Sequence, residues 1–297
     1  MSFGEFMQQL VNGISLGSLY ALVAIGYTMV YGILRLINFA HGDIMMLGAY
    51  FAFFGYAVFV LPWWLSFIIA IVITSLVGVL IDKVAYKPVR KAPRISALMT
   101  AIGVSFFLEN FGLVVFGGVP RGFHRPEMFG KLITIGGVRF VSYSIYIPLF
   151  TAIFLMLLLF LVYKTKIGMA MRAVSKDMET TRLMGIDVDF VISVTFAVGS
   201  ALAAAGGIMW AIKFPQINPL MGIMPGLKAF IAAVFGGIGD ITGAMLGGFI
   251  LGVIEIMTVA FFPDFAGYRD AIAFSLLIII LLFKPTGLMG EKIEEKV

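Results

Sequence analysis

The sequence consists mainly of long apolar stretches, separated by short segments that hold nearly all of its charged residues. Nine stretches are about as long as a helix needs to be to cross roughly 30 Å of hydrocarbon at about 1.5 Å per residue. They cover residues 10–33, 42–61, 65–81, 95–116, 145–163, 190–212, 220–238, 241–262 and 268–283. Stretches 65–81 and 220–238 are the weakest. The pattern predicts an all-α polytopic membrane protein, a bundle of eight or nine transmembrane helices.

Composition supports this fold class and excludes several others. The 297 residues are 61% hydrophobic and 12% charged, whereas a soluble domain carries about 25% charged residues. The chain has no cysteine and only two distant histidines, His41 and His124, so no metal site is predicted. It has no phosphate-binding loop for ATP, no triad spacing for catalysis and no basic surface for nucleic acid. No cofactor and no catalytic residue are expected.

The Lys and Arg residues predict how the bundle is oriented. With the N-terminus outside, the inner loops hold fourteen of them and the outer loops hold six. An excess of cations on the cytoplasmic side is the usual rule for membrane proteins. No basic residue precedes the first apolar stretch, so this stretch is expected to remain as a helix rather than act as a signal peptide.

Three connecting segments exceed about ten residues. In the outer loop 117–144, alternating apolar and polar residues around Gly136-Gly137 predict a small β-hairpin. The inner loop 82–94 is strongly basic. The inner loop 164–189 mixes acids and bases with Ala and Met at helical spacing, which predicts a short surface helix. Residues 284–297 form a cytoplasmic tail, and the whole chain, 1–297, is expected to form a single transmembrane domain.

The segment between the first two stretches carries several polar groups, among them Asn38, His41 and Asp43. One interpretation is a solvated turn in which Asn38 caps the following helix. The other is a gate on a transport pathway, because ionisable groups at membrane depth mark such pathways. Asn38 and His41 are therefore candidate pathway residues.

Charges inside the apolar stretches point to buried contacts or to a pathway. Glu255 lies within the eighth stretch and should face protein or a cavity, either as a helix-to-helix hydrogen bond or as a third candidate pathway residue. Glu109-Asn110 allows the same two interpretations. Lys228 lies inside the seventh stretch and is expected to extend its ammonium group to the outer surface.

Glycine and proline mark two further features of the second half. Proline and glycine interrupt the seventh stretch on both sides, which predicts one broken helix facing a pathway. Glycines four residues apart in the eighth stretch predict close helix packing. A weak internal similarity pairs Gly13-Ile14-x-x-Gly17 with Gly222-Ile223-x-x-Gly226 and Gly42-Asp43-Ile44 with Gly239-Asp240-Ile241. Chance explains it as well as duplication does.

The inner loop 164–189 contains Glu179-Thr-Thr-Arg-Leu-Met-Gly185, which resembles the Glu-Ala-Ala-x-x-x-Gly element of ABC importer permeases. In those proteins the element is a cytoplasmic coupling helix that docks into a groove on the ATPase subunit. The resemblance implies that Glu179, Arg182 and Gly185 contact the ATPase, with Arg172 and Asp177 flanking them. An ordinary amphipathic connector is the alternative.

The chain as a whole resembles the permeases of branched-chain amino-acid ABC importers, of the H type in the Liv system. The matching segments run from about residue 13 to residue 288. They are YALVAIGYTMVYG at 20–32, INFAHG at 37–42, RAVSKD at 172–177, LMGID at 183–187, GLKAFIAAVFGGIG at 226–239 and KPTGL at 284–288. The Asn-Phe-Ala-His-Gly string is the most specific of these, and the outer loop 117–144 shows the least family pattern.

The resemblance implies a non-enzymatic permease in the bacterial inner membrane. Its partners would be a second, different permease, two cytoplasmic ATPase subunits and a periplasmic binding protein that delivers leucine, isoleucine or valine. Related permeases move urea or short amides, and the residues alone do not separate these substrates. A stand-alone channel or secondary transporter is the competing function, because Asn38-Phe-Ala and Asn218-Pro-Leu resemble paired half-helix motifs. An intramembrane enzyme using His41 and Asp43 is a third and weaker alternative.

Overall fold

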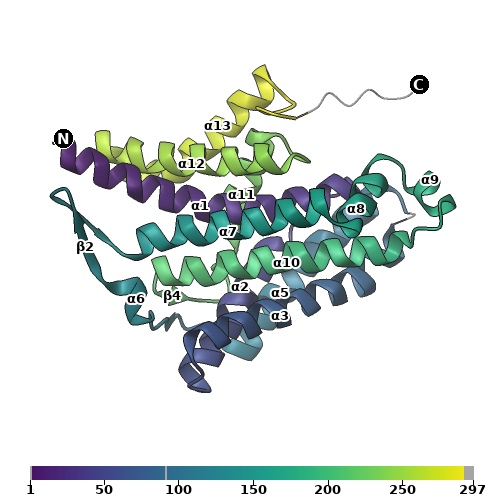
Figure 1. Cartoon of the computed structure of the whole chain (residues 1–297), viewed down its shortest axis with the longest axis horizontal. Helices are drawn as coiled ribbons and strands as arrows, with labels where there is room; N and C mark the ends of the chain where they lie inside the picture. Colours follow the sequence, from purple (N-terminus) through teal and green to yellow (C-terminus); the bar gives the residue numbers. More distant parts are fainter. Residues whose placement is uncertain (1, 91, 291–297) are drawn as a thin grey trace.

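A computed structural model describes residues 2–90 and 92–290 as a bundle of helices with two small two-stranded sheets at one end (Figure 1). The elements in chain order are α1 (Phe3–Leu34), α2 (His41–Phe53), η1 (Phe54–Val58), α3 (Trp63–Ile81), η2 (Asp82–Tyr86), α4 (Lys87–Val89), α5 (Arg94–Phe116), β1 (Arg121–Gly122), α6 (Glu127–Gly130), β2 (Leu132–Ile135), β3 (Val138–Val141), α7 (Tyr143–Lys164), α8 (Lys166–Lys176), α9 (Met178–Leu183), α10 (Val188–Lys213), β4 (Gln216–Ile217), α11 (Ile223–Gly236), α12 (Ile241–Phe261), η3 (Pro263–Tyr268) and α13 (Arg269–Phe283). The η1 and η2 segments are π-helical turns that continue α2 and α3, and η3 is a 3₁₀-helix.

The structure confirms the polytopic all-α class but not the predicted count of eight or nine complete spans. Within the described residues, seven helices are long and apolar enough to cross a membrane. The predicted stretches 42–61 and 220–238 instead form the shorter helices α2, with 13 residues, and α11, with 14. Each short helix follows a non-helical segment that ends in a turn: residues 35–40 precede α2, and residues 214–222, which include β4, precede α11. The stretch at 65–81, weak in the sequence, forms the complete helix α3.

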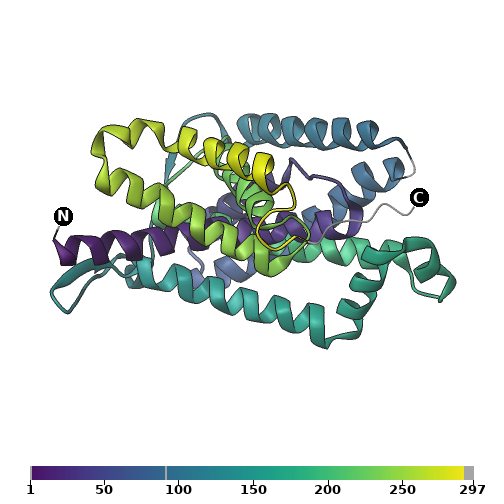
Figure 2. The ribbon, with the colours of Figure 1, turned by 90° about the horizontal axis from the view of Figure 1, so that it is seen from above.

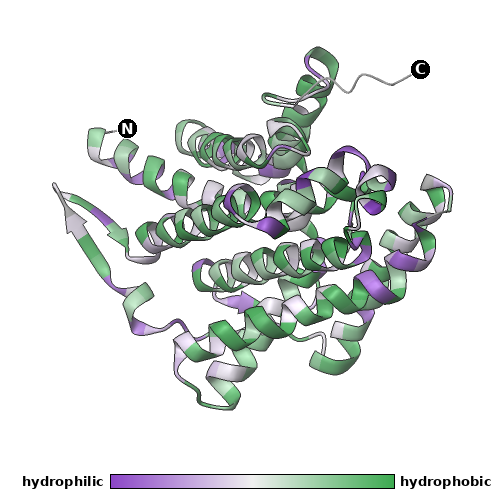
Figure 3. Cartoon of the chain, turned by 45° about the vertical axis from the view of Figure 1, so that its right-hand side comes forward, coloured by the Kyte–Doolittle hydropathy of each residue, from purple (hydrophilic) through white to green (hydrophobic). Residues whose placement is uncertain are grey.

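Hydropathy follows this arrangement. The long helices are mainly hydrophobic, and hydrophilic residues gather near their ends and on the connecting segments (Figure 3). Apolar side chains on the outside of α3, such as Val72 and Leu76, are 52% and 64% exposed, as expected for a surface that faces lipid. Helix α1, in contrast, is buried along most of its length from Gly13 onwards, so it forms the centre of the bundle.

Glycine allows the closest helix contacts. A Cβ atom added at Gly17 of α1 would lie 2.7 Å from the Phe249 Cα of α12, and one at Gly248 would lie 2.4 Å from the Ala21 backbone nitrogen. Gly236 and Gly243 make the same kind of contact between α11 and α12. Lipid tails are as apolar as the helices, so close backbone packing drives association where a hydrophobic force cannot. The predicted packing role of the α12 glycines is confirmed.

The two halves of the bundle repeat one pattern in opposite orientation. Helix α1 packs on α11 and α12, and α10 packs on α2 and α3. In Figures 1 and 2, α1 and α10 run in opposite directions along the same axis. The short helices α2 and α11 meet at Gly42 and Gly222, where a Cβ on either residue would lie within 2.5 Å of the other's carbonyl oxygen. Inverted repeats of this kind are common in transporters.

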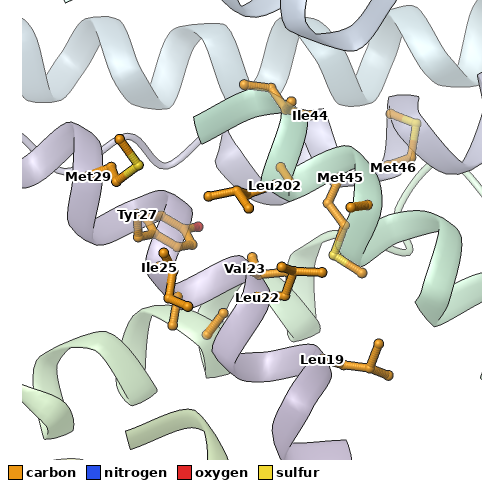
Figure 4. Close-up of a cluster of buried hydrophobic side chains, with 14 of the residues drawn as sticks. Leu19, Leu22, Val23, Ile25, Tyr27, Met29, Ile44, Met45, Met46 and Leu202 are labelled. Atoms are coloured by element: carbon orange, nitrogen blue, oxygen red, sulfur yellow. The ribbon is translucent and has the colours of Figure 1, made fainter. Parts of the chain in front are cut away.

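The buried apolar residues form one connected core around the crossing of the central helices. Figure 4 shows part of this core, with side chains from α1, α2 and α10 in contact across their crossing. The labelled residues are Leu19, Leu22, Val23, Ile25, Tyr27, Met29, Ile44, Met45, Met46 and Leu202.

The ends of the bundle carry the connecting segments. The predicted hairpin is confirmed: β2 pairs antiparallel with β3, and a turn at Gly136-Gly137 joins them. At the opposite end, the backbone nitrogens of Leu288 and Met289 donate to the carbonyls of Phe235 and Gly236, which holds residues 284–290 against α11. The remainder of the predicted tail, 291–297, and the orienting cations Lys91, Lys292 and Lys296 lie outside the described residues.

Candidate functional site

A network of ion pairs around Glu255 lies at the end of the bundle that holds the N-terminus. The Lys228 Nζ of α11 is 2.9 Å from Glu255 Oε1 and 2.7 Å from Asp270 Oδ1. The Tyr20 hydroxyl of α1 donates to Glu255 Oε2 at 2.9 Å. The side chains of Lys228 and Glu255 are only 8% and 5% exposed. Lys228 therefore does not reach the outer surface as the sequence predicted, because two acids satisfy its charge within the bundle.

This network forms one wall of a cavity of about 470 Å³. Six helices, α1, α7, α10, α11, α12 and α13, contribute to it, together with η3. The lining residues are Asn12, Leu16, Tyr20, Tyr143, Trp210, Lys213, Phe214, Met224, Pro225, Lys228, Glu255, Ile256, Ala266, Gly267, Arg269 and Asp270. Its size lies within the range of roughly 300–1,000 Å³ that is usual for small-molecule sites. Glu255 therefore makes the predicted helix-to-helix contact, and it also lines this cavity.

A second acid-centred network lies at the other end of the bundle. Asp82 at the end of α3 is fully buried, forms an ion pair with Arg90, and accepts from the Ser193 hydroxyl of α10 at 2.7 Å. Arg90 also contacts Asp189 at 2.7 Å, and Lys87 contacts the same carboxylate at 2.9 Å. These ion pairs tie the first turn of α10 to the segment that follows α3.

The polar segment before α2 is buried rather than solvated. Asn38 Oδ1 accepts from the Tyr86 hydroxyl at 2.7 Å, and no side chain caps α2. The interpretation of Asn38 as the cap of this helix was therefore wrong. His41 begins α2 with its ring 4.5 Å from the Tyr27 ring, and it is 1% exposed. Asp43 Oδ2 accepts from Ser105 of α5 at 2.5 Å. Asn38, His41 and Asp43 thus contact three different elements, η2, α1 and α5.

The segment at 164–189 forms two helices, α8 and α9, at the end of the bundle opposite the N-terminus. Helix α8 packs on α1, α7 and α10, and α9 projects from the bundle (Figure 1). Asp177 caps α9: its Oδ1 accepts from the backbone nitrogens of Glu179 and Thr180 at 2.9 and 3.1 Å. Gly185 ends the turn with φ of +81°, a conformation that favours glycine. The predicted surface helix is therefore present, and it is held in place by its own caps.

The side chains of this projection divide into anchors and free surface. The Arg172 guanidinium donates to the Val162 carbonyl and lies 5.3 Å from the Tyr163 ring, which anchors α8 to α7. Glu179 and Arg182 point to solvent. The sequence did not single out Leu183 and Met184, yet they are 87% and 77% exposed at the end of α9. Two exposed apolar side chains on a projecting helix are typical of a surface that binds another protein.

The structure separates the predicted site residues into distant groups. Asn38 and His41 lie near the crossing of α2 with its neighbours, Glu255 lies at the end that holds the N-terminus, and the coupling candidates lie at the opposite end. Sequence reasoning missed Asp270 and Lys213 in the cavity wall. The pairing of Lys228 with Glu255 could have been found, because a cation inside one apolar stretch and an acid inside another are both unfavourable against lipid and stabilise each other when they meet.

Comparison with known proteins identifies the family. The sequence profile of the family "Branched-chain amino acid transport system / permease component" matches residues 9–281. The chain is 44% identical to the high-affinity branched-chain amino acid transport system permease protein LivH of Salmonella typhimurium strain LT2, and the alignment covers 99% of each chain. It is 42% identical to the permease protein BraD of the corresponding system of Pseudomonas aeruginosa, over 99% of this chain and 98% of that protein.

A solved structure shows the same fold. A chain in the structure of PsaBC from Streptococcus pneumoniae in complex with Fab aligns with a TM-score of 0.50 at 13% identity, over 96% of this chain and 94% of that one. At this identity the likeness concerns the fold alone. The profile and the full-length relatives show that the chain is a multi-pass membrane protein that belongs to the family of branched-chain amino acid transport system permease components.

Proposed function

We propose that the chain is the membrane-spanning permease subunit of an ABC importer for leucine, isoleucine and valine. The observation that carries this proposal is the 42–44% identity, over almost the full length, to permease proteins of high-affinity branched-chain amino acid transport systems. The whole chain serves as one transmembrane domain in the bacterial inner membrane, with the N-terminus outside and the tail 284–297 inside. A second homologous permease completes the pathway, and a periplasmic binding protein delivers the amino acid to the end that carries the outer loop 117–144.

In this proposal the chain hydrolyses no ATP and is driven by two cytoplasmic ATPase subunits. The coupling loop 164–189 makes the contact, with Glu179 and Arg182 on its surface and Gly185 at its end. The exposed Leu183 and Met184 support this role, because a groove on the ATPase would cover apolar groups that solvent does not favour. Arg172 and Asp177 hold the loop in shape from within.

The ion pairs near this loop support a route by which its movement reaches the membrane. Helix α9 is followed directly by α10, whose Asp189 is paired with Lys87 and Arg90. The same segment carries Tyr86, which bonds to Asn38 before α2. A shift of the loop would therefore reach the α2 segment through contiguous polar contacts. We propose that Asn38, His41 and Glu255 belong to the translocation pathway.

Uptake measurements test the coupling role. The chain is produced with the other subunits encoded beside its gene, in a host without its own branched-chain importers, and uptake of labelled leucine is followed together with ATP hydrolysis. Replacing Leu183 and Met184 together by Asp should abolish uptake while the complex still inserts in the membrane. The matched control is Leu183→Met/Met184→Leu, which keeps both exposed side chains apolar and should leave uptake close to normal.

Gly185→Pro gives a second test. Proline restricts φ to about −65°, which is incompatible with the +81° found at Gly185, so the end of α9 must change. We expect ATP hydrolysis without uptake. Normal uptake in this variant would contradict the coupling assignment.

The alternative function, a stand-alone channel, rests on α2 and α11, the two short helices that meet at Gly42 and Gly222 within the bundle. Solute flux through liposomes that hold only this chain, measured with leucine and with urea, distinguishes the two functions. Rapid flux in the absence of ATPase subunits would favour the channel, and flux of urea rather than leucine would change the substrate.

A further inference from the structure

We propose that the cavity beside Glu255 binds an apolar amino acid as a zwitterion, with its carboxylate toward Lys213 and its ammonium group toward Asp270. This inference rests on the proposed function, which places the cavity at the outer end of the bundle. It adds a binding site within this subunit and assigns the groups that recognise the substrate.

More cationic than acidic side chains line the cavity. Lys213, Lys228 and Arg269 provide three cations, and Glu255 and Asp270 provide two acids. Lys228 is paired with both acids. Lys213 Nζ donates only to the neutral Ser15 hydroxyl at 3.0 Å and lies 5.4 Å from the Tyr143 ring, and the described residues place no carboxylate within ion-pair distance of it. A cation in a protected site that lacks a counter-ion favours an anionic ligand group.

A helix terminus adds to the attraction for a carboxylate. Met224 and Pro225, in the first turn of α11, line the same cavity. The first turn of a helix carries a partial positive charge, and broken helices in transporters direct such ends at anionic substrate groups. The positive end of α11 and the Lys213 ammonium group thus contribute to one wall of the cavity.

The acidic and apolar residues of the cavity favour an ammonium group and an aliphatic side chain on the same ligand. Asp270 is 52% exposed, so one of its oxygens can pair with a ligand ammonium group while the other stays 2.7 Å from Lys228. Leu16, Trp210 and Ile256 provide apolar surface between the charged groups. A ligand with a carboxylate, an ammonium group and an aliphatic side chain satisfies all three sets of groups, and the cavity of about 470 Å³ is large enough for it.

The absence of cysteine from the chain makes a sharp test possible. Ala266→Cys places one thiol at the wall of the cavity, and Val119→Cys places one outside it at the same end of the bundle. Maleimide labelling of this chain is measured in the complete transporter in nanodiscs, without ATP or binding protein. Leucine should slow the labelling of Ala266→Cys by about tenfold at saturation and leave Val119→Cys unchanged.

Leucine analogues and a variant of Lys213 test which charged groups of the ligand and of the cavity contribute to binding. 4-Methylpentanoate lacks the ammonium group and isoamylamine lacks the carboxylate, so each should protect at least about tenfold more weakly than leucine. Adding Lys213→Met to the Ala266→Cys protein should raise the half-protecting leucine concentration by about tenfold or more. Lys131→Met, on an exposed lysine at the same end of the bundle, is the control and should cause no change.

Each outcome decides the proposal. Failure of leucine to protect Ala266→Cys, in a transporter that still takes up leucine, would overturn this inference and leave the proposed function intact. Protection by glycerol 3-phosphate but not by leucine would show a site for phosphate groups and would also overturn it. A transporter that neither binds nor takes up leucine, but moves another solute, would refute the proposed substrate itself.

Discussion

Replacing Lys228 by Met should destabilise the protein far more than replacing either of its acidic partners. Lys228 and Glu255 are 8% and 5% exposed, so the variant leaves the Glu255 carboxylate buried without a cation. Breaking a buried ion pair costs about 3–5 kcal/mol. The cavity lets water reach one side of this pair, so we expect a loss of about 3 kcal/mol, at the lower end of that range.

The partners should respond differently because Lys228 has two of them. Glu255→Gln leaves Lys228 with Asp270 at 2.7 Å, so the loss should stay below about 2 kcal/mol. Asp270 is 52% exposed, and Asp270→Asn should cost less than about 1 kcal/mol. The double variant Lys228→Met/Glu255→Gln removes both buried charges and should recover much of the loss caused by Lys228→Met alone.

Equilibrium unfolding by SDS in mixed micelles measures these free energies, and together the variants form a double-mutant cycle. A loss below about 1 kcal/mol for Lys228→Met would refute the reasoning, since Lys228 would then not compensate a buried acid. Equal losses for Lys228→Met and Glu255→Gln would show that Asp270 contributes nothing to the network.

Three further predictions concern helix packing, capping and the polar route. Gly248→Val should prevent stable assembly, because its Cβ would lie 2.4 Å from the α1 backbone, whereas Gly103→Ala, with open space around it, should assemble normally in size-exclusion chromatography. Asp177→Ala should cost about 1 kcal/mol of local stability at the start of α9, seen as faster amide hydrogen exchange there, and unchanged exchange would contradict the cap. Tyr86→Phe leaves Asn38 Oδ1 without its donor and should lower leucine uptake severalfold at unchanged expression, while wild-type uptake would remove this bond from the proposed route.

Much of the architecture could be predicted from the sequence because the bilayer imposes a simple rule. A segment that crosses hydrocarbon must satisfy its backbone internally and expose apolar side chains, so length and hydropathy alone identify most of the spans. The hairpin at Gly136-Gly137, the surface helix before Gly185 and the packing role of the α12 glycines were found for equally local reasons. The sequence motifs also led to the family.

Only the tertiary structure decided which charges meet and where helices are short. Lys228 and Glu255 are 27 residues apart, and Tyr20 is 235 residues from the same acid, so no local pattern connects them. Their contacts join α1, α11 and α12, and a comparable long-range contact brings Gly42 against Gly222. Hydropathy is a property of each segment by itself, whereas the partner of a buried charge is set by the packing of several segments, and that packing is specified by contacts between residues far apart in the chain.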